Sequence, residues 1–383
     1  MMAVAIGTAA LIIVLSVFNG LEELIRDSYN TFDPEIKVVP AQGKSFVVTD
    51  SLLNSLSAVE GIDIITEVIE DNALALYRDA QMLIKLKGVS NNFIDQHRID
   101  KAMVYGELNL QKGNVNYAIL GRGVQYGLSI APADEFYALK IYYPKKSGLS
   151  SMRSINLSGN AYNQKSILPG GVFAIEQQFD SQYVIVPLSF AQELFDYENR
   201  RTALEIKTTP ERSVREVQQK LQSLLGGEFK ILNSDEQHAG LLRAIKIEKL
   251  FVYLTFSFIL AIASFNIFFS LSMLAIEKKK DVAMLFAMGA TRRTVKSIFL
   301  YEGAIIALTG AIVGLVIALA LCWVQQEFGI VSMGMQTAIV DAYPVKMQFS
   351  DFFFTSISII VITFFAAYRP ASIASHTEIK DYL

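Results

Sequence analysis

The sequence of 383 residues predicts an α-helical membrane protein with four transmembrane helices and a large α+β extracytoplasmic domain inserted between helices 1 and 2. Hydrophobic residues make up 52% of the chain and charged residues only 19%, a composition too apolar for an ordinary soluble domain. The apolar residues gather in four runs. By contrast, residues 30–233 contain no run long enough to cross a bilayer, and their pattern predicts alternating strands and helices.

The uncharged apolar run at residues 250–276 predicts the second membrane helix. At about 1.5 Å per residue it reaches roughly 40 Å, more than the roughly 30 Å of a hydrocarbon core. Basic side chains crowd the residues that follow, and such clusters mark the cytoplasmic side of a membrane helix. They are Lys278, Lys279, Lys280, Arg292, Arg293 and Lys296. The loop that carries them is therefore expected to face the cytosol.

The other runs are residues 3–18, 298–324 and 352–368. The first is short and lacks the basic flank of a signal peptide, so it predicts a membrane helix whose natural start has been trimmed. In the run at 298–324, Gly310 and Gly314 have the GxxxG spacing that permits close contact between helices. This spacing is too common to establish a dimer. The expected membrane helices are residues 1–19, 250–276, 298–324 and 352–368. The expected regions between and after them are the periplasmic domain with its stalk helices at 20–249, a cytoplasmic coupling segment at 277–297, a periplasmic loop at 325–351 and a cytoplasmic tail at 369–383.

The extracytoplasmic region has enough residues for a domain core, or for two subdomains. Runs of β-branched and aromatic residues predict strands at 35–39, 62–69, 73–77, 82–87, 117–120, 138–143, 183–186, 203–207 and 228–232. Helices are predicted at 50–57, 188–197 and 211–225. Residues 234–250 are expected to stay helical into the membrane run, forming either a rod that carries movement or a simple linker.

The basic loop also has a helical pattern. Apolar residues at Val282, Leu285, Phe286 and Met288 fit a short amphipathic helix that ends at Gly289. Thr291 is placed to cap the next helix. A short helix across the cytoplasmic ends of two membrane helices suits docking to a soluble partner, whereas the alternative is an ordinary loop with positive flanks.

Residues 265–314 resemble the signature of the FtsX-like permease family of ABC transporters, most closely its lipoprotein-releasing members LolC and LolE. The matching positions are Asn266, Glu277, Lys278, Asp281, Leu285, Gly289, Ala290 and Arg292 or Arg293. Residues 14–24, VLSVFNGLEEL, resemble the end of the first helix in these permeases, and residues 343–352 and 368–383 resemble their ending.

This resemblance implies a non-catalytic subunit that docks on a separate LolD-like ATPase dimer, which binds the ATP and magnesium. The docking residues it implies are Glu277, Lys278, Lys280, Asp281, Leu285, Met288, Gly289, Ala290, Thr291, Arg292 and Arg293. The sequence agrees, because it contains no G-x-x-x-x-G-K-[ST] phosphate loop. No cofactor and no metal site is expected in this chain, and His97, His238 and His376 are expected at the surface. A formal charge of −3 gives no reason to expect nucleic acid binding.

The extracytoplasmic region resembles the periplasmic core domain of MacB-like and LolC-like permeases, notably at residues 118–130 and 183–195. By analogy, residues 30–70 and 200–245 form one subdomain, and the middle is an inserted β-rich one. Residues 144–166, which precede a strand at 167–175, correspond to a hook that grips the LolA-like lipoprotein carrier, with candidates Lys145, Met152, Arg153, Asn156 and Tyr162. The segment lacks a proline-rich character, and the alternative is a plain flexible loop.

The function implied is extraction of acylated lipoproteins from the bacterial inner membrane, with the large domain in the periplasm and a second permease subunit completing the complex. Phe18, Phe251 and Phe258 are candidates to line an apolar cavity for the acyl chains, although each could equally face lipid. Two rival functions remain open. One is a MacB-like exporter of peptides or drugs, and the other is an FtsX-type regulator of a cell-wall hydrolase, whose external domain is typically smaller.

Overall fold

The computed structural model describes residues 2–131, 137–145, 162–332 and 342–376. They divide into two compact units. The helical unit contains the described residues up to 25 and from 240 onwards. The sheet unit contains the described residues from 26 to 239. The boundary between the units therefore falls inside the first long helix and near the start of the second.

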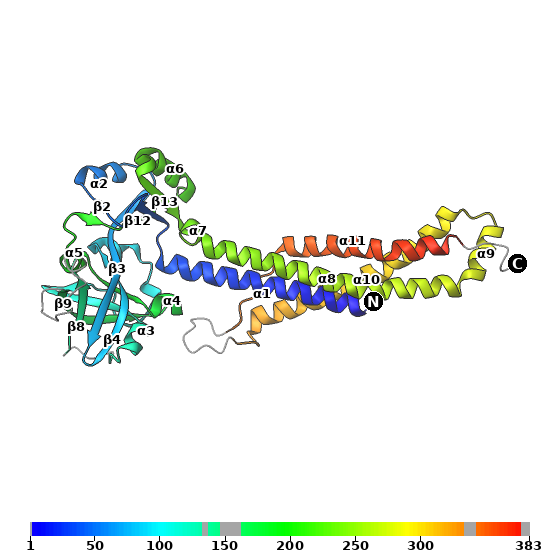
Figure 1. The fold of residues 1–383 in the computed structure, drawn as a ribbon, viewed down its shortest axis with the longest axis horizontal. Coiled ribbons are helices and arrows are strands. Elements are labelled where there is room, and N and C mark those ends of the chain that lie inside the picture. Colours follow the sequence, from blue (N-terminus) through cyan, green and yellow to red (C-terminus); the bar gives the residue numbers. More distant parts are fainter. Residues whose placement is uncertain (1, 132–136, 146–161, 333–341, 377–383) are drawn as a thin grey trace, which may run out of the picture. The chain divides into compact units, whose positions relative to one another are not determined.

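In the described part of the chain, four helices are long and apolar enough to cross a membrane (Figure 1). They are α1 (Met2–Phe32), α8 (Ala239–Glu277), α10 (Arg292–Phe328) and α11 (Phe349–Ala374), with the short helix α9 (Lys279–Ala287) between α8 and α10. Each long helix extends beyond its predicted apolar run, because a helix does not end where its hydrophobic stretch ends.

The fourth long helix does not end at residue 368, where the predicted apolar run ends. Helix α11 continues through Pro370 to Ala374. A proline inside a helix removes one backbone hydrogen bond. Here Ala371 and Ala374 are buried against Ala275 and Phe299, so packing holds the last turn in place despite that loss.

The prediction of one unbroken helix over residues 234–250 is wrong. Helix α7 (Ser234–Gln237) ends at His238, and α8 begins at Ala239. His238, expected at the surface, is half-buried, and its ring stacks on Tyr29 with centroids 3.7 Å apart. Its Nε2 atom lies 2.6 Å from the carboxylate of Asp33. These contacts hold His238 outside helical geometry and interrupt the helix.

Small residues set the packing of the helical unit. A Cβ atom at Gly7 of α1 would lie 2.8 Å from Leu260 of α8, and one at Gly303 of α10 would lie 2.9 Å from Ala367 of α11. A Cβ atom at Gly314 would overlap the carbonyl oxygen of Ala5. The close approach at Gly314 is thus a contact between α10 and α1 of the same chain. The buried apolar residues around these contacts are Val4, Leu11, Leu15, Leu260, Ile267, Leu271, Ala307, Ala311, Ile359 and Ala367.

The sheet unit is built on one mixed sheet. Its described strands are β1 (Ile36–Pro40), β3 (Ile62–Tyr77), β4 (Ala80–Val89), β5 (Met103–Gly106), β6 (Gln111–Lys112), β7 (Val115–Gly121), β8 (Leu139–Pro144), β9 (Tyr162–Phe173), β10 (Tyr183–Pro187), β12 (Ala203–Thr208) and β13 (Phe229–Asn233). The strand order is β13-β1-β12-β3-β4-β10-β7-β9-β5, with β8 pairing β3 and β9, and β6 pairing β7. A separate ribbon pairs β2 (Phe46–Val47) with β11 (Arg200–Arg201).

All nine predicted strands coincide with observed ones, but two of them, 62–69 and 73–77, are parts of the single strand β3. The polar residues between them do not break it, because Glu70 and Asn72 pair with Lys87 and Lys85 of β4. The predicted loop at 144–166 is too long at both ends, since Pro144 and Tyr162 pair as the ends of β8 and β9. Short strands without a marked pattern, such as β5 and β6, were not predicted.

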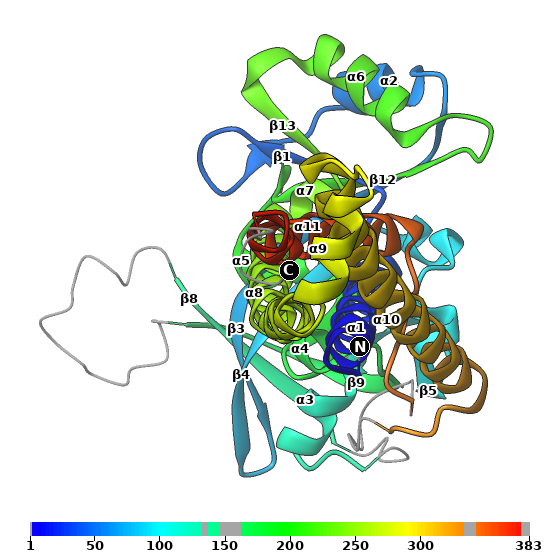
Figure 2. The same ribbon diagram turned by 90° about the vertical axis from the view of Figure 1, so that its right-hand side faces the viewer.

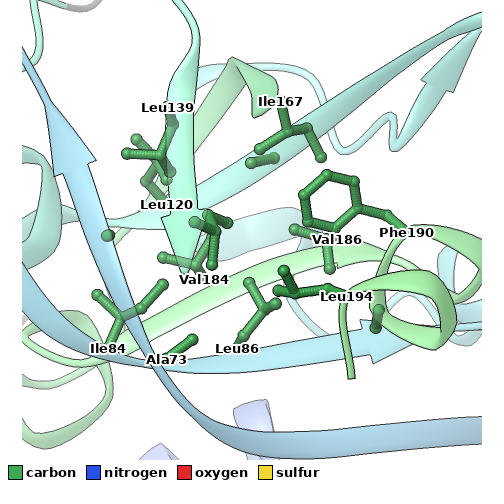
Figure 3. Close-up of a cluster of buried hydrophobic side chains, with 14 of the residues drawn as sticks. Ala73, Ile84, Leu86, Leu120, Leu139, Ile167, Val184, Val186, Phe190 and Leu194 are labelled. Carbon is green, nitrogen blue, oxygen red and sulfur yellow. The ribbon is translucent and has the colours of Figure 1, made fainter. Parts of the chain in front are cut away.

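Two hydrophobic cores lie on this sheet, which belongs to a single compact unit, so the division into subdomains stays a prediction. The first is formed by the middle of the sequence, between residues 69 and 197, and includes Leu86, Leu120, Val184 and Phe190 (Figure 3). The second is formed by segments from both ends of the unit. There the helices α2 (Asp50–Ser57) and α6 (Val214–Leu225), side by side in Figure 2, bury Leu56 and Leu221.

The sheet unit also contains the 3₁₀ helices η1 (Asn91–Gln96), η2 (Asp100–Ala102) and η4 (Gly226–Glu228). Its further short α-helices among the described residues are three. They are α3 (Arg122–Gly127), α4 (Gln177–Asp180) and α5 (Leu188–Phe195). Helix α5 buries Phe190, Leu194 and Phe195 in the first core. The predicted helix at 188–197 is therefore confirmed, although it ends two residues earlier, at Phe195. The next residue, Asp196, has a left-handed φ of 56°.

Candidate functional site

The candidate site in the helical unit is the segment that joins α8 to α10. Helix α9 starts almost directly after α8, and the N–H of Lys278 donates to the carbonyl of Leu274 at 2.9 Å. Val282 and Ala283 are buried on one side of α9, against a cluster that includes Val295 and Phe299 of α10. Of the four residues predicted to form the apolar face of this helix, Val282 is buried, Leu285 and Phe286 are half-buried, and Met288 is exposed. The prediction of a buried face is therefore correct only in part.

The turn after α9 follows the local signals of the sequence. Gly289 has a φ of +93°, a conformation that residues with a Cβ atom rarely adopt. Thr291 then caps α10, because its Oγ1 atom accepts a hydrogen bond from the N–H of Thr294 at 3.2 Å. The turn is thus fixed by residues within it, and it holds α9 in a defined place beside α10.

The outer face of α9 carries an exposed apolar patch. Met284 is 55% exposed and Met288 is 76% exposed. They line a shallow hollow of about 530 Å³ together with Asp281, Leu285 and Ala287. Large exposed methionines are adaptable contacts for a protein partner. Met284 was missed by the sequence analysis, although its i, i+4 spacing from Met288 places both on one face.

We call this surface the α9 patch. Asp281 is the charged residue among those that line it, and further charged residues precede and follow it in the sequence. Lys278 and Asp281 form an ion pair of 3.0 Å in which both side chains are more than half exposed, so it contributes little to stability. The predicted docking residues Glu277, Lys278, Lys280, Asp281, Met288, Gly289, Thr291, Arg292 and Arg293 are exposed, while Leu285 and Ala290 are half-buried. The structure therefore brings the predicted residues together on one short segment with an accessible apolar centre.

The three aromatic candidates do not form one described pocket. Phe251 and Phe258 are 65% and 69% exposed, and they lie two turns apart on one face of α8 with Leu254 between them. Phe18 is half-buried on α1. A different apolar hollow of about 240 Å³ lies between α10 and α11, lined by residues that include Leu308 and Phe364.

The predicted carrier-binding segment begins and ends on a β-hairpin. Lys145 follows β8 and is half-buried, and Tyr162 starts β9 and is 58% exposed. Met152, Arg153 and Asn156 lie outside the described residues. Pro144 pairs with Tyr162 in the antiparallel ladder of β8 and β9.

Residues 253–379 match the model of the FtsX-like permease C-terminal family. This segment is an FtsX-like permease domain. It contains most of α8, the α9 patch, α10 and α11, so the predicted docking residues all belong to it. The predicted resemblance to this family is confirmed.

Curated relatives extend the similarity over the whole chain. The lipoprotein-releasing system transmembrane protein LolC of Xylella fastidiosa (strain 9a5c) is 22% identical, over 100% of this chain and 92% of the relative. LolE of Haemophilus influenzae is 20% identical, over 98% of this chain and 91% of the relative. The chain thus resembles these proteins outside the FtsX-like permease domain as well.

Two solved structures resemble part of the chain. The periplasmic region of MacB from Actinobacillus actinomycetemcomitans has 13% identity and a TM-score of 0.37, and the match covers 54% of this chain and 91% of that one. The extracellular domain of the transporter YknZ from Gram-positive bacteria has 14% identity and a TM-score of 0.34, with coverages of 52% and 99%.

Proposed function

We propose that this chain is the transmembrane subunit of an ABC transporter that extracts lipoproteins from the bacterial inner membrane and passes them to a periplasmic carrier. One observation carries the proposal. The similarity to lipoprotein-releasing transmembrane proteins runs along the full chain and over about nine-tenths of each relative, rather than being confined to the permease domain. The helical unit and the sheet unit therefore both resemble parts of the same kind of protein.

The topology of the proposal follows from charge. The basic residues around α9 favour the cytoplasmic side for that segment. Helices α1 and α8 each cross the membrane once, so the sheet unit, which lies between them in the sequence, is in the periplasm. The segment after β8 is then available to a LolA-like carrier on that side.

The energy source is a separate LolD-like ATPase dimer that docks on the α9 patch. An apolar centre of Met284 and Met288 with a charged rim has the usual character of a protein interface. Because α9 is held to α8 and α10 by backbone hydrogen bonds and buried side chains, a displacement of α9 passes into both helices. The ATP and magnesium belong to the partner, and this chain supplies movement without chemical catalysis.

The substrate is amphiphilic, so its acyl chains require apolar surface inside the membrane. The exposed face of α8 with Phe251, Leu254 and Phe258 supplies such a surface. Phe18 on α1 is the third proposed contact. A second permease subunit placed against this face would enclose the acyl chains between the two.

The test is release of a fluorescent triacylated lipoprotein from proteoliposomes that contain this protein and its cognate ATPase. The expected result is release that needs both ATP and the soluble carrier, with omission of each as a control. ATP turnover without release, whichever carrier is supplied, would contradict the proposal and favour a peptide exporter or a regulator of a cell-wall hydrolase.

A further inference from the structure

A cluster of three polar side chains joins three helices of the helical unit. The Nζ atom of Lys249 on α8 donates to Oδ1 of Asn19 on α1 at 2.6 Å. The Nδ2 atom of Asn19 donates to Oδ2 of Asp351 on α11, also at 2.6 Å. Lys249 lies 3.3 Å from both carboxylate oxygens of Asp351. Each of the three residues therefore contacts the other two.

The cluster lies where two apolar runs begin. Lys249 and Asp351 stand directly before the runs at 250–276 and 352–368. Asn19 is 1% exposed and Asp351 is 8% exposed. Charges in such a place are costly unless they are paired and hydrogen-bonded. The carboxylate also lies in the first turn of α11, where the helix dipole favours negative charge.

The same face of α1 holds the segment that leads into α11. Ser16, Asn19, Gly20 and Glu23 have helical spacing and share that face. The carbonyl of Ser16 accepts from the N–H of Lys346 at 2.9 Å, and the carbonyl of Lys346 accepts from Nδ2 of Asn19 at 3.2 Å.

Two further contacts fix this segment. The Lys346 ammonium pairs with Glu23. At Gly20, a Cβ atom would overlap the carbonyl oxygen of Pro344, so only glycine lets the segment lie this close to α1. The side chains of Asn19 and Glu23 and the backbone of Ser16 thus bind α1 to the segment that leads into α11.

We propose that Asn19, Lys249 and Asp351 are positioning residues that form a brace between α1, α8 and α11. Apolar packing lets helices slide, whereas directional hydrogen bonds to a buried asparagine fix their register. With the brace intact, a displacement of α8 moves α1 and α11 with it. The proposed acyl-chain contacts on α1 and α8 then move together. This role rests on the proposed function, because it concerns how ATP hydrolysis is converted into release.

The test compares release per ATP hydrolysed in the full complex for wild type, Lys249→Met, Asp351→Asn and the charge swap Lys249→Asp/Asp351→Lys. The single variants are expected to lower release per ATP about tenfold or more, with ATP turnover kept within about twofold. The swap is expected to restore it to within about threefold of wild type, because the amide of Asn19 can rotate and reverse its donor and acceptor.

Restoration is incomplete because a lysine at position 351 opposes the dipole of α11. The matched control is Glu60→Gln/Lys220→Met, which removes an exposed ion pair of 3.2 Å in the sheet unit and is expected to change nothing. The brace would be overturned if the single variants released as much lipoprotein per ATP as wild type. It would also be overturned if the charge swap released no more lipoprotein per ATP than the single variants.

A second readout separates this proposal from the function on which it rests. Nitroxide labels at positions 22 and 246, in a Cys322→Ala background, report the distance between α1 and α8 by pulsed electron paramagnetic resonance. If wild type hydrolyses ATP without releasing lipoprotein, the proposed function fails, and these distances decide the brace. The brace is supported if the distribution of distances between the two labels is broader in Lys249→Met than in wild type and narrow again in the charge swap. Distance distributions of equal width in all variants would overturn the brace.

Discussion

The ammonium group of Lys87 lies 2.7 Å from the carboxylate of Glu205, and both side chains are fully buried in the sheet unit. Arg98 completes the cluster, since it pairs with Glu205 and donates from Nη1 to the carbonyl of Phe32 at 2.9 Å. The Lys87 ammonium also lies 4.6 Å from the centre of the Phe32 ring. The last residue of α1 is thus anchored by a buried charge cluster.

Replacing Glu205 by glutamine is expected to destabilise the sheet unit strongly. Two cations would then stay buried without a counter-charge, which typically costs about 3–5 kcal/mol. Thermal unfolding in detergent, followed by circular dichroism, measures this loss. Glu60→Gln is the control, because Glu60 pairs with Arg212 and Lys220 at an exposed site and should cost less than about 1 kcal/mol.

The same carboxylate predicts an acid-sensitive fold. Burial favours the neutral form of Glu205, but Lys87 and Arg98 outweigh burial and lower its pKa from 4.5 to about 2. Because the folded pKa is lower than the unfolded one, the stabilisation is complete above pH 4.5 and is lost as the pH falls towards 2. The shift is worth about 3 kcal/mol at 1.36 kcal/mol per unit.

The expected result is an unfolding temperature that falls more steeply below pH 4.5 in wild type than in Glu205→Gln. Scans at several pH values in a nonionic detergent measure both slopes. Parallel profiles for the two proteins would mean that Glu205 does not bear the acid sensitivity.

Some of this structure could be predicted from local sequence and some could not. The helix α9 and its turn were predictable, because Gly289 and Thr291 act on their own neighbours. The brace was not, since Lys249 is 230 residues from Asn19 and 102 from Asp351. The burial of Lys87 was not predictable either, because its partner Glu205 lies on β12, far along the chain. Pairing between distant charges leaves no trace in hydrophobic periodicity.

A charge placed in the α9 patch is expected to weaken docking of the ATPase. Met288→Glu would put a carboxylate at the centre of an apolar contact, where it would lose its hydration. Binding of the purified ATPase should weaken about tenfold or more, which corresponds to about 1.4 kcal/mol. The control is Leu83→Glu, since Leu83 is 67% exposed on β4 in the sheet unit. Equal ATPase binding by both variants and wild type would remove the α9 patch as the docking surface.

Changing the turn after α9 is expected to uncouple the ATPase without unfolding the sheet unit. Proline fixes φ near −65°, whereas Gly289 has a φ of +93°. Gly289→Pro would also remove the hydrogen bond from the N–H of Gly289 to the carbonyl of Phe286. Reconstituted release should fall at least about tenfold. The circular dichroism of the sheet unit should not change, and Gly227→Ala is the control, since a Cβ atom there meets nothing within 4 Å. Release at the wild-type level would show that α9 needs no fixed orientation.

The GxxxG spacing of α10 makes its own prediction, because the structure gives Gly314 a neighbour inside the chain. A Cβ atom there would overlap the carbonyl oxygen of Ala5 and lie 2.8 Å from Cβ of Thr8, so backbone must move. Gly314→Ala is therefore expected to cost about 1–3 kcal/mol in thermal unfolding. Gly240→Ala is the control, since a Cβ atom there meets nothing within 4 Å. If the motif served a dimer instead, Gly314→Ala would shift the oligomer mass in native mass spectrometry and leave the unfolding temperature of the monomer unchanged.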